Sequence, residues 1–328
     1  MADDGTDRTG ALRRDLDGLL AALERSPAQE QAPALAALLD SCEARLAAPL
    51  APEPVRTLHH FACSGGTLIA KALSAMPNTV VLNEIDPLSQ IHTQVPKQPF
   101  FPTDMIAALR YSPRPIGDDT LLEVFGAGLL ALRDDMTRRG MRLVLRDHAH
   151  SLFCTDHAPA DRPDLYTVVR RISPVRGVVT VRHPLDSFLS LKHNNWVHFS
   201  PGTLEDYSRR YLAFLDVHTG LPVVKYEDFV TRTDETAARL CEILELPFDP
   251  CFETVMPLAR LSGDSGRSSA VISARPRRAL PPELIEEAGR SPSYDRLCAR
   301  LDYRPQPEQD GKPVQEQAEK PQGGDALP

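Results

Sequence analysis

The stretch that most constrains the fold is a short apolar run ending in a glycine turn. The run, Val55 to Phe61, leads into Ser64-Gly65-Gly66-Thr67, and a helical pattern follows from Leu68 to Met76. This order predicts a strand, a tight turn and a helix, which point backbone N–H groups and a helix dipole at one spot. Such a spot suits an anion such as a phosphate, while a plain helix cap explains the same residues equally well.

Short apolar runs alternate with helical patterns from Val55 onward. The runs are rich in Val and Leu without polar alternation, which is typical of strands buried on both faces of a parallel sheet. The predicted fold class is therefore α/β, a three-layer wound sheet, mostly parallel, with helices on both faces. The predicted strands are 56–62, 79–82, 142–145, 165–169, 177–181 and 221–225. The predicted helices are 68–76, 103–109, 120–139, 185–194, 203–218, 235–244, 282–288 and 294–301.

Two terminal segments differ from this core in composition. Residues 1–50 are rich in Ala and Leu and predict a helical hairpin, whose apolar faces need a partner surface. That partner is either the main domain or a second copy of the chain, so a homodimer through these helices is one of two open interpretations. Residues 55–303 form the predicted α/β domain. Residues 304–328 carry Pro, Gln, Glu and Gly with almost no apolar content and are predicted to be disordered.

Charge, hydropathy and cysteine usage argue against several classes of protein. The net charge of -8 disfavours non-specific binding to nucleic acid. No window approaches the roughly 18 apolar residues of a membrane span, and Met1-Ala2-Asp3-Asp4 does not resemble the start of a secretory signal. The six cysteines are scattered without a Cys-x-x-Cys pair, which is typical of reduced thiols. We therefore expect a cytoplasmic protein without a nucleic-acid or membrane partner.

A second candidate anion-binding motif follows the predicted strand 177–181. It reads Arg182-His183-Pro184-Leu185-Asp186-Ser187-Phe188-Leu189-Ser190. The strand delivers Arg182 to the edge of the sheet, and Ser190 lies two turns into a helix that Pro184 begins. A guanidinium and a hydroxyl in this arrangement suit one more phosphate. Taken alone, an Arg182–Asp186 pair and a Ser190 bonded to its own backbone would explain the motif as well.

Together with Tyr226-Glu227-Asp228, which follows strand 221–225, these motifs resemble sulfotransferases that use 3′-phosphoadenosine 5′-phosphosulfate (PAPS). The stretch Cys63-Ser64-Gly65-Gly66-Thr67-Leu68 is similar to the family's loop for the 5′-phosphosulfate. Residues Arg182 to Ser190 fit its Arg-x-Pro-x-Asp-x-x-x-Ser motif for the 3′-phosphate. The resemblance covers about residues 55–270 and implies a P-loop-NTPase-like sulfotransferase fold. It also implies that PAPS contacts Cys63, Ser64, Gly65, Gly66, Thr67, Leu68, Arg182, Ser190 and Tyr226.

A glycine-containing segment nearer the C-terminus resembles the family's loop that closes over the cofactor. It runs from Leu261 to Ser268, and the resemblance implies cofactor contacts from Gly263, Gly266 and Arg267. Three arginines follow, and they either join the site or form a solvated basic tail: Arg275, Arg277 and Arg278.

The residue before Ser64 departs from the family's pattern. Cys63 stands where the family has a basic residue, and a thiol cannot neutralise a transferring sulfonate. Arg146, at the end of strand 142–145, is the candidate replacement. Lys71 is the other nearby cation, but the apolar face of its helix places it on the opposite, solvated side.

Two residues are candidates for the base that deprotonates the acceptor. Leu145-Arg146-Asp147-His148 resembles the Lys-Thr-His segment of cytosolic sulfotransferases, which implies His148. The segment after the predicted strand 79–82 resembles tyrosylprotein sulfotransferases, whose base is a glutamate in this place. This resemblance implies Glu84, which is as far from Ser64 along the chain as that glutamate is from its own Ser-Gly loop. A histidine titrates near neutrality, whereas a glutamate needs its pKa raised by its surroundings. We favour Glu84, because its spacing is preserved and Asp147 can hold His148 in a structural pair.

The histidines give no clear metal signal in the sequence. His148-Ala149-His150 places two imidazoles on one face, but no third ligand at metal spacing is evident. Of the adjacent pair His59 and His60, at most one reaches the site, because neighbouring strand residues point to opposite faces. We therefore predict no metal.

The resemblance implies an enzyme that transfers the sulfuryl group from PAPS to a hydroxyl or amine of a small-molecule or carbohydrate acceptor. One alternative is a nucleotide-dependent kinase-like enzyme on the same fold, which the absence of Gly-Lys-Ser/Thr disfavours. Another is a catalytically silent adaptor, which Cys63 supports. The acceptor pocket is expected to involve residues 86–119 and 194–202, including Trp196.

Overall fold

The computed structural model describes the chain from residue 52 with gaps, and only scattered positions before it. The described residues are 14, 16–18, 20–21, 37, 39–40, 52–89, 91, 103–114, 116–156, 162–259 and 272–305. The chain divides into two compact units, Met1–Pro52 and Glu53–Pro328. Most of the predicted N-terminal hairpin and of the 304–328 tail lies outside the described residues, so the hairpin, its homodimer and the disorder of the tail stay predictions.

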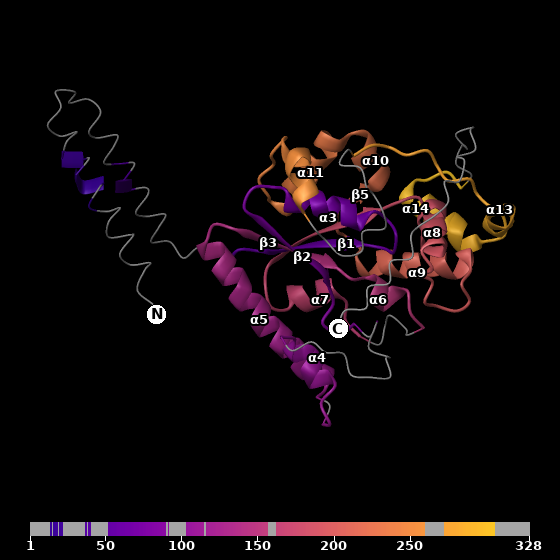
Figure 1. The fold of residues 1–328 in the computed structure, drawn as a ribbon, viewed down its shortest axis with the longest axis horizontal. Helices are drawn as coiled ribbons and strands as arrows, with labels where there is room; N and C mark the ends of the chain where they lie inside the picture. The colour runs from indigo at the N-terminus through magenta and orange to yellow at the C-terminus, as the bar shows by residue number, and fades with distance from the viewer. Residues whose placement is uncertain are drawn as a thin grey trace, which may run out of the picture. The chain divides into compact units, whose positions relative to one another are not determined.

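A five-stranded parallel sheet forms the centre of the second unit, with strand order β2-β3-β1-β4-β5 (Figure 1). Its strands are β1 (Val55–His60), β2 (Thr79–Ile85), β3 (Arg142–Asp147), β4 (Val175–Val181) and β5 (Val223–Lys225). Both faces of the sheet carry apolar side chains because helices cover both of them. The predicted class, a wound and mostly parallel α/β sheet, is confirmed.

The helices form the two outer layers (Figure 1). One layer contains α3 (Gly66–Ser74), α10 (Tyr226–Thr231) and α11 (Thr233–Leu244), and its core joins Leu58, Val144 and Val178 of the sheet to Ile69 and Leu240. The other layer contains α5 (Asp118–Arg138), α6 (His150–Phe153), α7 (Leu165–Arg170), α8 (Pro184–His193) and α9 (Leu204–Val217). The remaining helices are α4 (Met105–Arg110), α12 (Phe252–Val255), η2 (Met256–Leu258), α13 (Pro282–Ala288) and α14 (Pro292–Leu301).

One predicted strand is wrong, because residues 165–169 form helix α7. Asp164 caps this helix, and its carboxylate accepts hydrogen bonds from the backbone N–H groups of Tyr166 and Thr167. Leu165, Val168 and Val169 then face the core at helical spacing. A short apolar run does not distinguish a buried strand from one helical turn by periodicity, and the capping aspartate decides for the helix.

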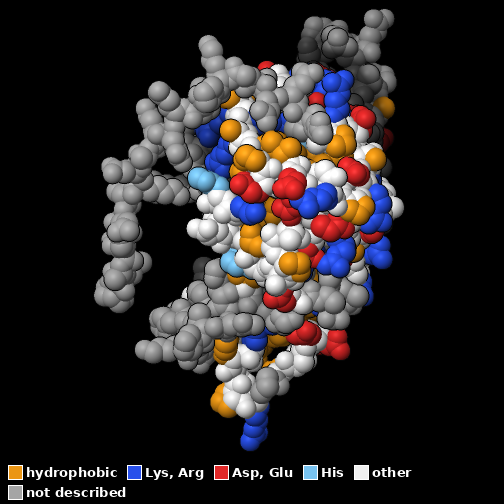
Figure 2. Space-filling view, turned by 90° about the vertical axis from the view of Figure 1, so that its right-hand side faces the viewer, with side chains coloured by type: hydrophobic (Ala, Val, Ile, Leu, Met, Phe, Trp, Pro, Cys, Tyr) orange, Lys and Arg blue, Asp and Glu red, His pale blue; other side chains and the backbone are white. Residues whose placement is uncertain are grey.

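Three further properties complete the description of the fold. Among the described residues, no helix combines the length and the apolar character that crossing a membrane requires. On the face shown in Figure 2, acidic and basic side chains are interspersed, so this face offers no uniform field to a polyanion. The five described cysteines are free thiols, as predicted.

Candidate functional site

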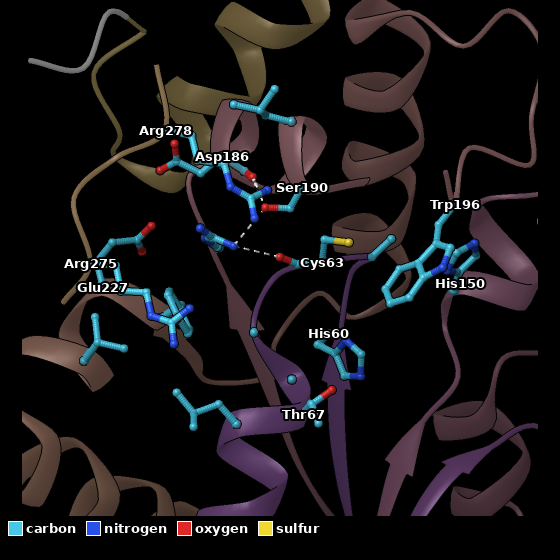
Figure 3. A pocket seen from close by; sticks show the side chains of 18 of the residues that line it. His60, Cys63, Thr67, His150, Asp186, Ser190, Trp196, Glu227, Arg275 and Arg278 are labelled. Carbon is cyan, nitrogen blue, oxygen red and sulfur yellow. Dashed lines mark hydrogen bonds between the residues drawn. The ribbon is translucent and has the colours of Figure 1, made fainter. Parts of the chain in front are cut away.

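A cavity of about 660 Å³ lies where the carboxyl ends of the strands meet (Figure 3). Because the five strands are parallel, the residues at these ends gather at one edge of the sheet. Every strand contributes to the lining. After β1 the lining residues are Cys63, Gly65, Gly66, Thr67 and Leu68. The other strands contribute Glu84 of β2, Arg146 and His148 at the end of β3, Arg182 after β4, and Tyr226 after β5.

The glycine turn after β1 is packed more tightly than a plain helix cap requires. Gly65 adopts φ +90° as the N-cap of α3, and a Cβ atom there would collide with the ring of Tyr226. A Cβ atom on Gly66 would likewise collide with the ring of His60. Ser64 is fully buried, and its Oγ donates to the carbonyl of Phe61 at 2.7 Å, so Ser64 shapes the turn from beneath the cavity. The turn therefore presents backbone N–H groups of the first turn of α3 to the cavity.

Arg182 joins the turn to the motif after β4. Its Nη1 donates to the carbonyl of Cys63 at 3.3 Å and to Oγ of Ser190 at 3.5 Å (Figure 3). Its guanidinium lies 5.0 Å from the centre of the Tyr226 ring, a cation–π distance. The Nε atom of Arg182 is buried and has no hydrogen-bond partner among the described residues.

The simple pairing of Arg182 with Asp186 does not occur. Asp186 instead accepts hydrogen bonds from Nε of Arg277, at 2.8 and 2.9 Å to its two oxygens. The hydrogen bond of Ser190 to its own helix does occur, because its Oγ donates to the carbonyl of Asp186 at 2.7 Å. Arg275, Arg277 and Arg278 all line the cavity, so these three arginines belong to the site.

Tyr226-Glu227-Asp228 begins helix α10 and contacts the motif that follows β4. Besides the contacts of Tyr226, Glu227 accepts a hydrogen bond from the backbone N–H of His183 at 2.9 Å. Its second oxygen accepts from the hydroxyl of Tyr303 at 2.7 Å. Glu227 thus fixes the turn between Arg182 and α8. Tyr303, just after α14, holds the Glu227 carboxylate in place.

Glu84 is held in the cavity by an irregular backbone. Its φ of +55° is unusual for a glutamate, and the pairing of β2 with β3 is irregular between Leu82 and Ile85. A bulge at a strand end turns a side chain toward a site that regular pairing would not reach. The Glu84 carboxylate contacts Nη2 of Arg146 at 2.9 Å and lies 3.6 Å from Nε2 of His148. The two candidate bases are therefore direct neighbours.

Arg146 is buried and directs its guanidinium at neighbouring side chains. Its Nε donates to Nε2 of His60 at 2.9 Å, and its Nη1 donates to Oδ1 of Asn83 at 2.7 Å. Burial and the nearby Arg146 lower the pKa of His60 well below its usual value, so this imidazole is neutral and accepts the bond. His60 donates from Nδ1 to the carbonyl of Phe61 at 3.2 Å. The sequence did not indicate this role for His60 or Asn83.

Aromatic and imidazole side chains line another part of the cavity. Trp196, His150 and His198 lie there together with His148, and the rings of His150 and His198 are 5.5 Å apart. In Figure 3, Trp196 and His150 stand on the side opposite Arg275 and Arg278. The cavity therefore has a cationic part, with Arg182 and the arginines after residue 272, and an aromatic part with the histidines.

The remaining predicted site residues divide into three cases. Burial raises the pKa of the Cys63 thiol to about 11, so it stays neutral at pH 7. Lys71 is absent from the cavity lining, as its place on α3 predicted. Gly263, Gly266 and Arg267 lie outside the described residues.

No family model and no curated protein matches this chain. Several solved structures are similar to it. The sulfotransferase domain from the Synechococcus PCC 7002 olefin synthase is 14% identical over 78% of this chain and 97% of that chain, with a TM-score of 0.49. A sulfotransferase from Alicyclobacillus acidocaldarius is 16% identical over 77% and 97%, with a TM-score of 0.41. Mouse sulfotransferase SULT7A1, complexed with PAP, is 11% identical over 76% and 89%, with a TM-score of 0.35.

These three structures are sulfotransferases, the same family that the sequence motifs resemble. Since each TM-score is below 0.5, we infer the function from the residues of the site.

Proposed function

We propose that this protein is a PAPS-dependent sulfotransferase that acts on a hydroxyl or amine of a small-molecule or carbohydrate acceptor. The observation that carries the proposal is the meeting of two anion-binding motifs in one cavity. The turn after β1 and the Arg182–Ser190 motif after β4 are joined by the hydrogen bonds of Arg182 to Cys63 and Ser190. A ligand with phosphate groups at two separate positions fits this pair of motifs.

The residues present fit such a ligand. The guanidinium of Arg182 and the Ser190 hydroxyl, which both line the cavity, would hold the 3′-phosphate. The backbone from Cys63 to Leu68 would hold the 5′-phosphosulfate at the N-terminus of α3. When bound, PAPS supplies an activated sulfuryl group whose leaving group is a phosphate. Gly263, Gly266 and Arg267 remain proposed contacts on the basis of the sequence resemblance.

We assign the base to Glu84 and a positioning role to Arg146. The ion pair at 2.9 Å orients one oxygen of Glu84, and the other remains beside His148 and the cavity. That carboxylate would accept the proton of the acceptor's hydroxyl or amine. Asn83 and His60 fix Arg146 in turn, so the orientation of Glu84 depends on a buried network. His148 is the alternative base, and it lies within reach of the same proton.

The charge that Cys63 does not supply has other sources in the cavity. Arg182 lies beside the turn, and Arg275 and Arg278 line the cavity without a described ion pair that occupies them. Fixed positive groups stabilise charge that develops on a transferring group and its leaving oxygen. We therefore propose that Arg182 and the arginines after residue 272 replace the basic residue that the loop lacks.

The acceptor binds, in this proposal, against the aromatic part of the cavity. Trp196, His150 and His198 offer flat surfaces for a ring or the apolar face of a sugar, and they lie beside the Glu84–His148 pair.

A kinase-like reaction fits less well. Two of the three lining carboxylates are engaged by arginines, Glu84 by Arg146 and Asp186 by Arg277, and the third, Glu227, accepts from His183 and Tyr303.

Two measurements test the proposal. Isothermal titration with 3′-phosphoadenosine 5′-phosphate (PAP) should show binding to the full chain, and its absence would exclude a PAPS site. A screen of phenols, amines, alcohols and sugars with PAPS, read by release of PAP, should identify an acceptor. Turnover of magnesium ATP without PAP binding would instead support the kinase-like alternative. PAP binding without transfer to any acceptor would support the silent adaptor.

A further inference from the structure

A second polar cluster lies outside the cavity, on the face of the sheet that α7 and α9 cover. It consists of His59 on β1, Asp147 at the end of β3, Asp164 at the N-cap of α7 and His218 at the C-cap of α9. All four side chains are buried, with none more than 6% exposed. None of them lines the cavity. Polar side chains sealed in this way need a defined set of partners.

The nitrogen and oxygen atoms of this cluster converge. Nδ1 of His59 lies 2.7 Å from Oδ2 of Asp147, and Nε2 of His218 lies 4.0 Å from the same oxygen. Nε2 of His218 also lies 3.5 Å from Oδ2 of Asp164. The ligand atoms of His59, Asp147 and His218 all lie within 4.8 Å of one another. These are the atoms that divalent transition metals bind in proteins.

The hydrogen bonding of His218 leaves a lone pair directed into the cluster. Its Nδ1 lies 2.8 Å from the carbonyl of Phe214, an acceptor, so Nδ1 carries the proton. Its Nε2 is buried and has no hydrogen-bond partner among the described residues, and neither does Nε2 of His59. A metal-binding imidazole commonly donates its other N–H to a backbone carbonyl, which fixes the ring. The hydrogen bond from Nδ1 of His218 to the Phe214 carbonyl gives His218 this arrangement.

Charge also favours a cation between these side chains. Neither Asp147 nor Asp164 forms an ion pair with a lysine or arginine within the described part of the chain. The lone pair of His218 therefore faces two carboxylates at 3.5 and 4.0 Å with no positive group between them. One divalent cation would neutralise both carboxylates and give the imidazole a partner.

The spacing fits a small cation after a modest local shift. Tetrahedral Zn²⁺ with bonds of about 2.1 Å separates its ligand atoms by about 3.4 Å. The 3.5 Å distance from His218 to Asp164 matches that value. The 4.0 Å distance from His218 to Asp147 has to shorten, and the 2.7 Å distance from Nδ1 of His59 to Asp147 has to lengthen, each by several tenths of an ångström. Asp164 is anchored as the cap of α7, so it either completes the ligand set or orients the ligands from its side.

We propose that His59, Asp147 and His218 bind one divalent transition-metal ion, best matched by Zn²⁺, with Asp164 as the fourth ligand or the group that positions the others. This structural metal joins β1, β3 and the end of α9. The proposal does not depend on the activity of the cavity, and it replaces the prediction of no metal made from the sequence.

The first experiment measures metal bound to the full-length, tag-free wild-type protein. The protein is incubated with excess Zn²⁺, passed through gel filtration and analysed for metal and protein content. We expect about one Zn²⁺ per chain, and Co²⁺ in its place should give visible d–d absorption bands of a low-coordinate site. A folded wild-type protein that retains less than about 0.1 of Zn²⁺, Co²⁺ or Ni²⁺ per chain would overturn the proposal.

The second experiment assigns the metal to these residues. His218→Gln should lose the bound metal, and Asp164→Asn should weaken it by about 10- to 100-fold. The matched controls are His150→Gln and His198→Gln in the cavity, which should keep one metal per chain. Equal loss in the controls, or full retention in His218→Gln, would overturn the assignment. If His218→Gln does not fold, the wild-type stoichiometry and the weaker binding in Asp164→Asn decide.

Discussion

The two sides of the β1–β3 pair carry different polar clusters built from neighbouring residues. His60 and Arg146 face the cavity, while His59 and Asp147, one position away on the same strands, face the sealed side under α7 and α9. Side chains alternate along a strand, so two adjacent residues reach two separate environments. A polar residue beside a functional motif therefore does not have to serve that motif. The cavity side should control binding and turnover, and the sealed side should control stability.

The largest expected effect on the cavity side comes from Glu84→Gln. Removing the proposed base should lower kcat by about 100- to 10,000-fold, because the amide cannot accept the proton of the acceptor. PAP affinity, measured by titration, should stay within about twofold of the wild type. His148→Gln is the control, with a smaller expected loss. A larger loss in His148→Gln than in Glu84→Gln would transfer the role of base to His148.

Arg182→Ala should weaken PAP binding without removing the fold. Its guanidinium makes the charged contacts that join the two anion motifs, and each such hydrogen bond contributes about 1.5–3 kcal/mol. We expect PAP affinity to fall by about 10- to 100-fold, measured by isothermal titration. Lys71→Ala, a cation on α3 outside the lining, should bind PAP as the wild type does. Equal weakening in both variants would show a general charge effect.

Exchanging the adjacent histidines for phenylalanine, one at a time, tests the comparison most directly. His60→Phe removes the acceptor for Nε of Arg146, so kcat should fall by about tenfold through misplacement of Glu84. His59→Phe leaves Asp147 without its 2.7 Å partner, so the free energy of unfolding should fall by about 1–3 kcal/mol. Denaturant titration and steady-state kinetics measure both. If the two variants behave alike, the division into two sides is wrong.

The smallest expected effect comes from Arg277→Ala. Its ion pair with Asp186 is partly exposed, so its net contribution is about 0.2–1 kcal/mol. The PAP dissociation constant should therefore change by less than about fivefold, and the change should shrink at high salt. Asp186→Ala and the double variant complete a cycle that isolates the pair. A loss as large as that of Arg182→Ala would mean that Arg277 contacts the nucleotide itself.

The sequence predicted the architecture well because the signals for it are local. Five strands and most helices follow from apolar runs and helical spacing, and the two anion motifs meet because parallel strands end at one edge. The strand predicted at residues 165–169 was wrong, because the apolar run is ambiguous and the capping residue Asp164 favours a helix.

Parts of the site were not predictable because they depend on packing between distant segments. The contact of Arg146 with His60 joins residues 86 positions apart. The contact of His218 with Asp164 joins the end of α9 to the connection between α6 and α7, which share no sequence motif. The backbone turn that brings Glu84 into the cavity has no sequence signature, since positive φ values for glutamate are rare. Arg277 was known only as one of three arginines whose role stayed open.

The close packing of the glycine turn restricts how this protein can diverge. A side chain at Gly65 collides with Tyr226 after β5, and one at Gly66 collides with His60 at the end of β1, so each glycine is matched to an aromatic or imidazole ring. Replacing either partner alone leaves a clash or a void, and both reduce stability. Accepted changes at these positions should therefore occur in pairs. A collection of diverging sequences should show Gly65 varying together with Tyr226, and Gly66 together with His60, while Trp196 and His198 vary with the acceptor and independently of both glycines.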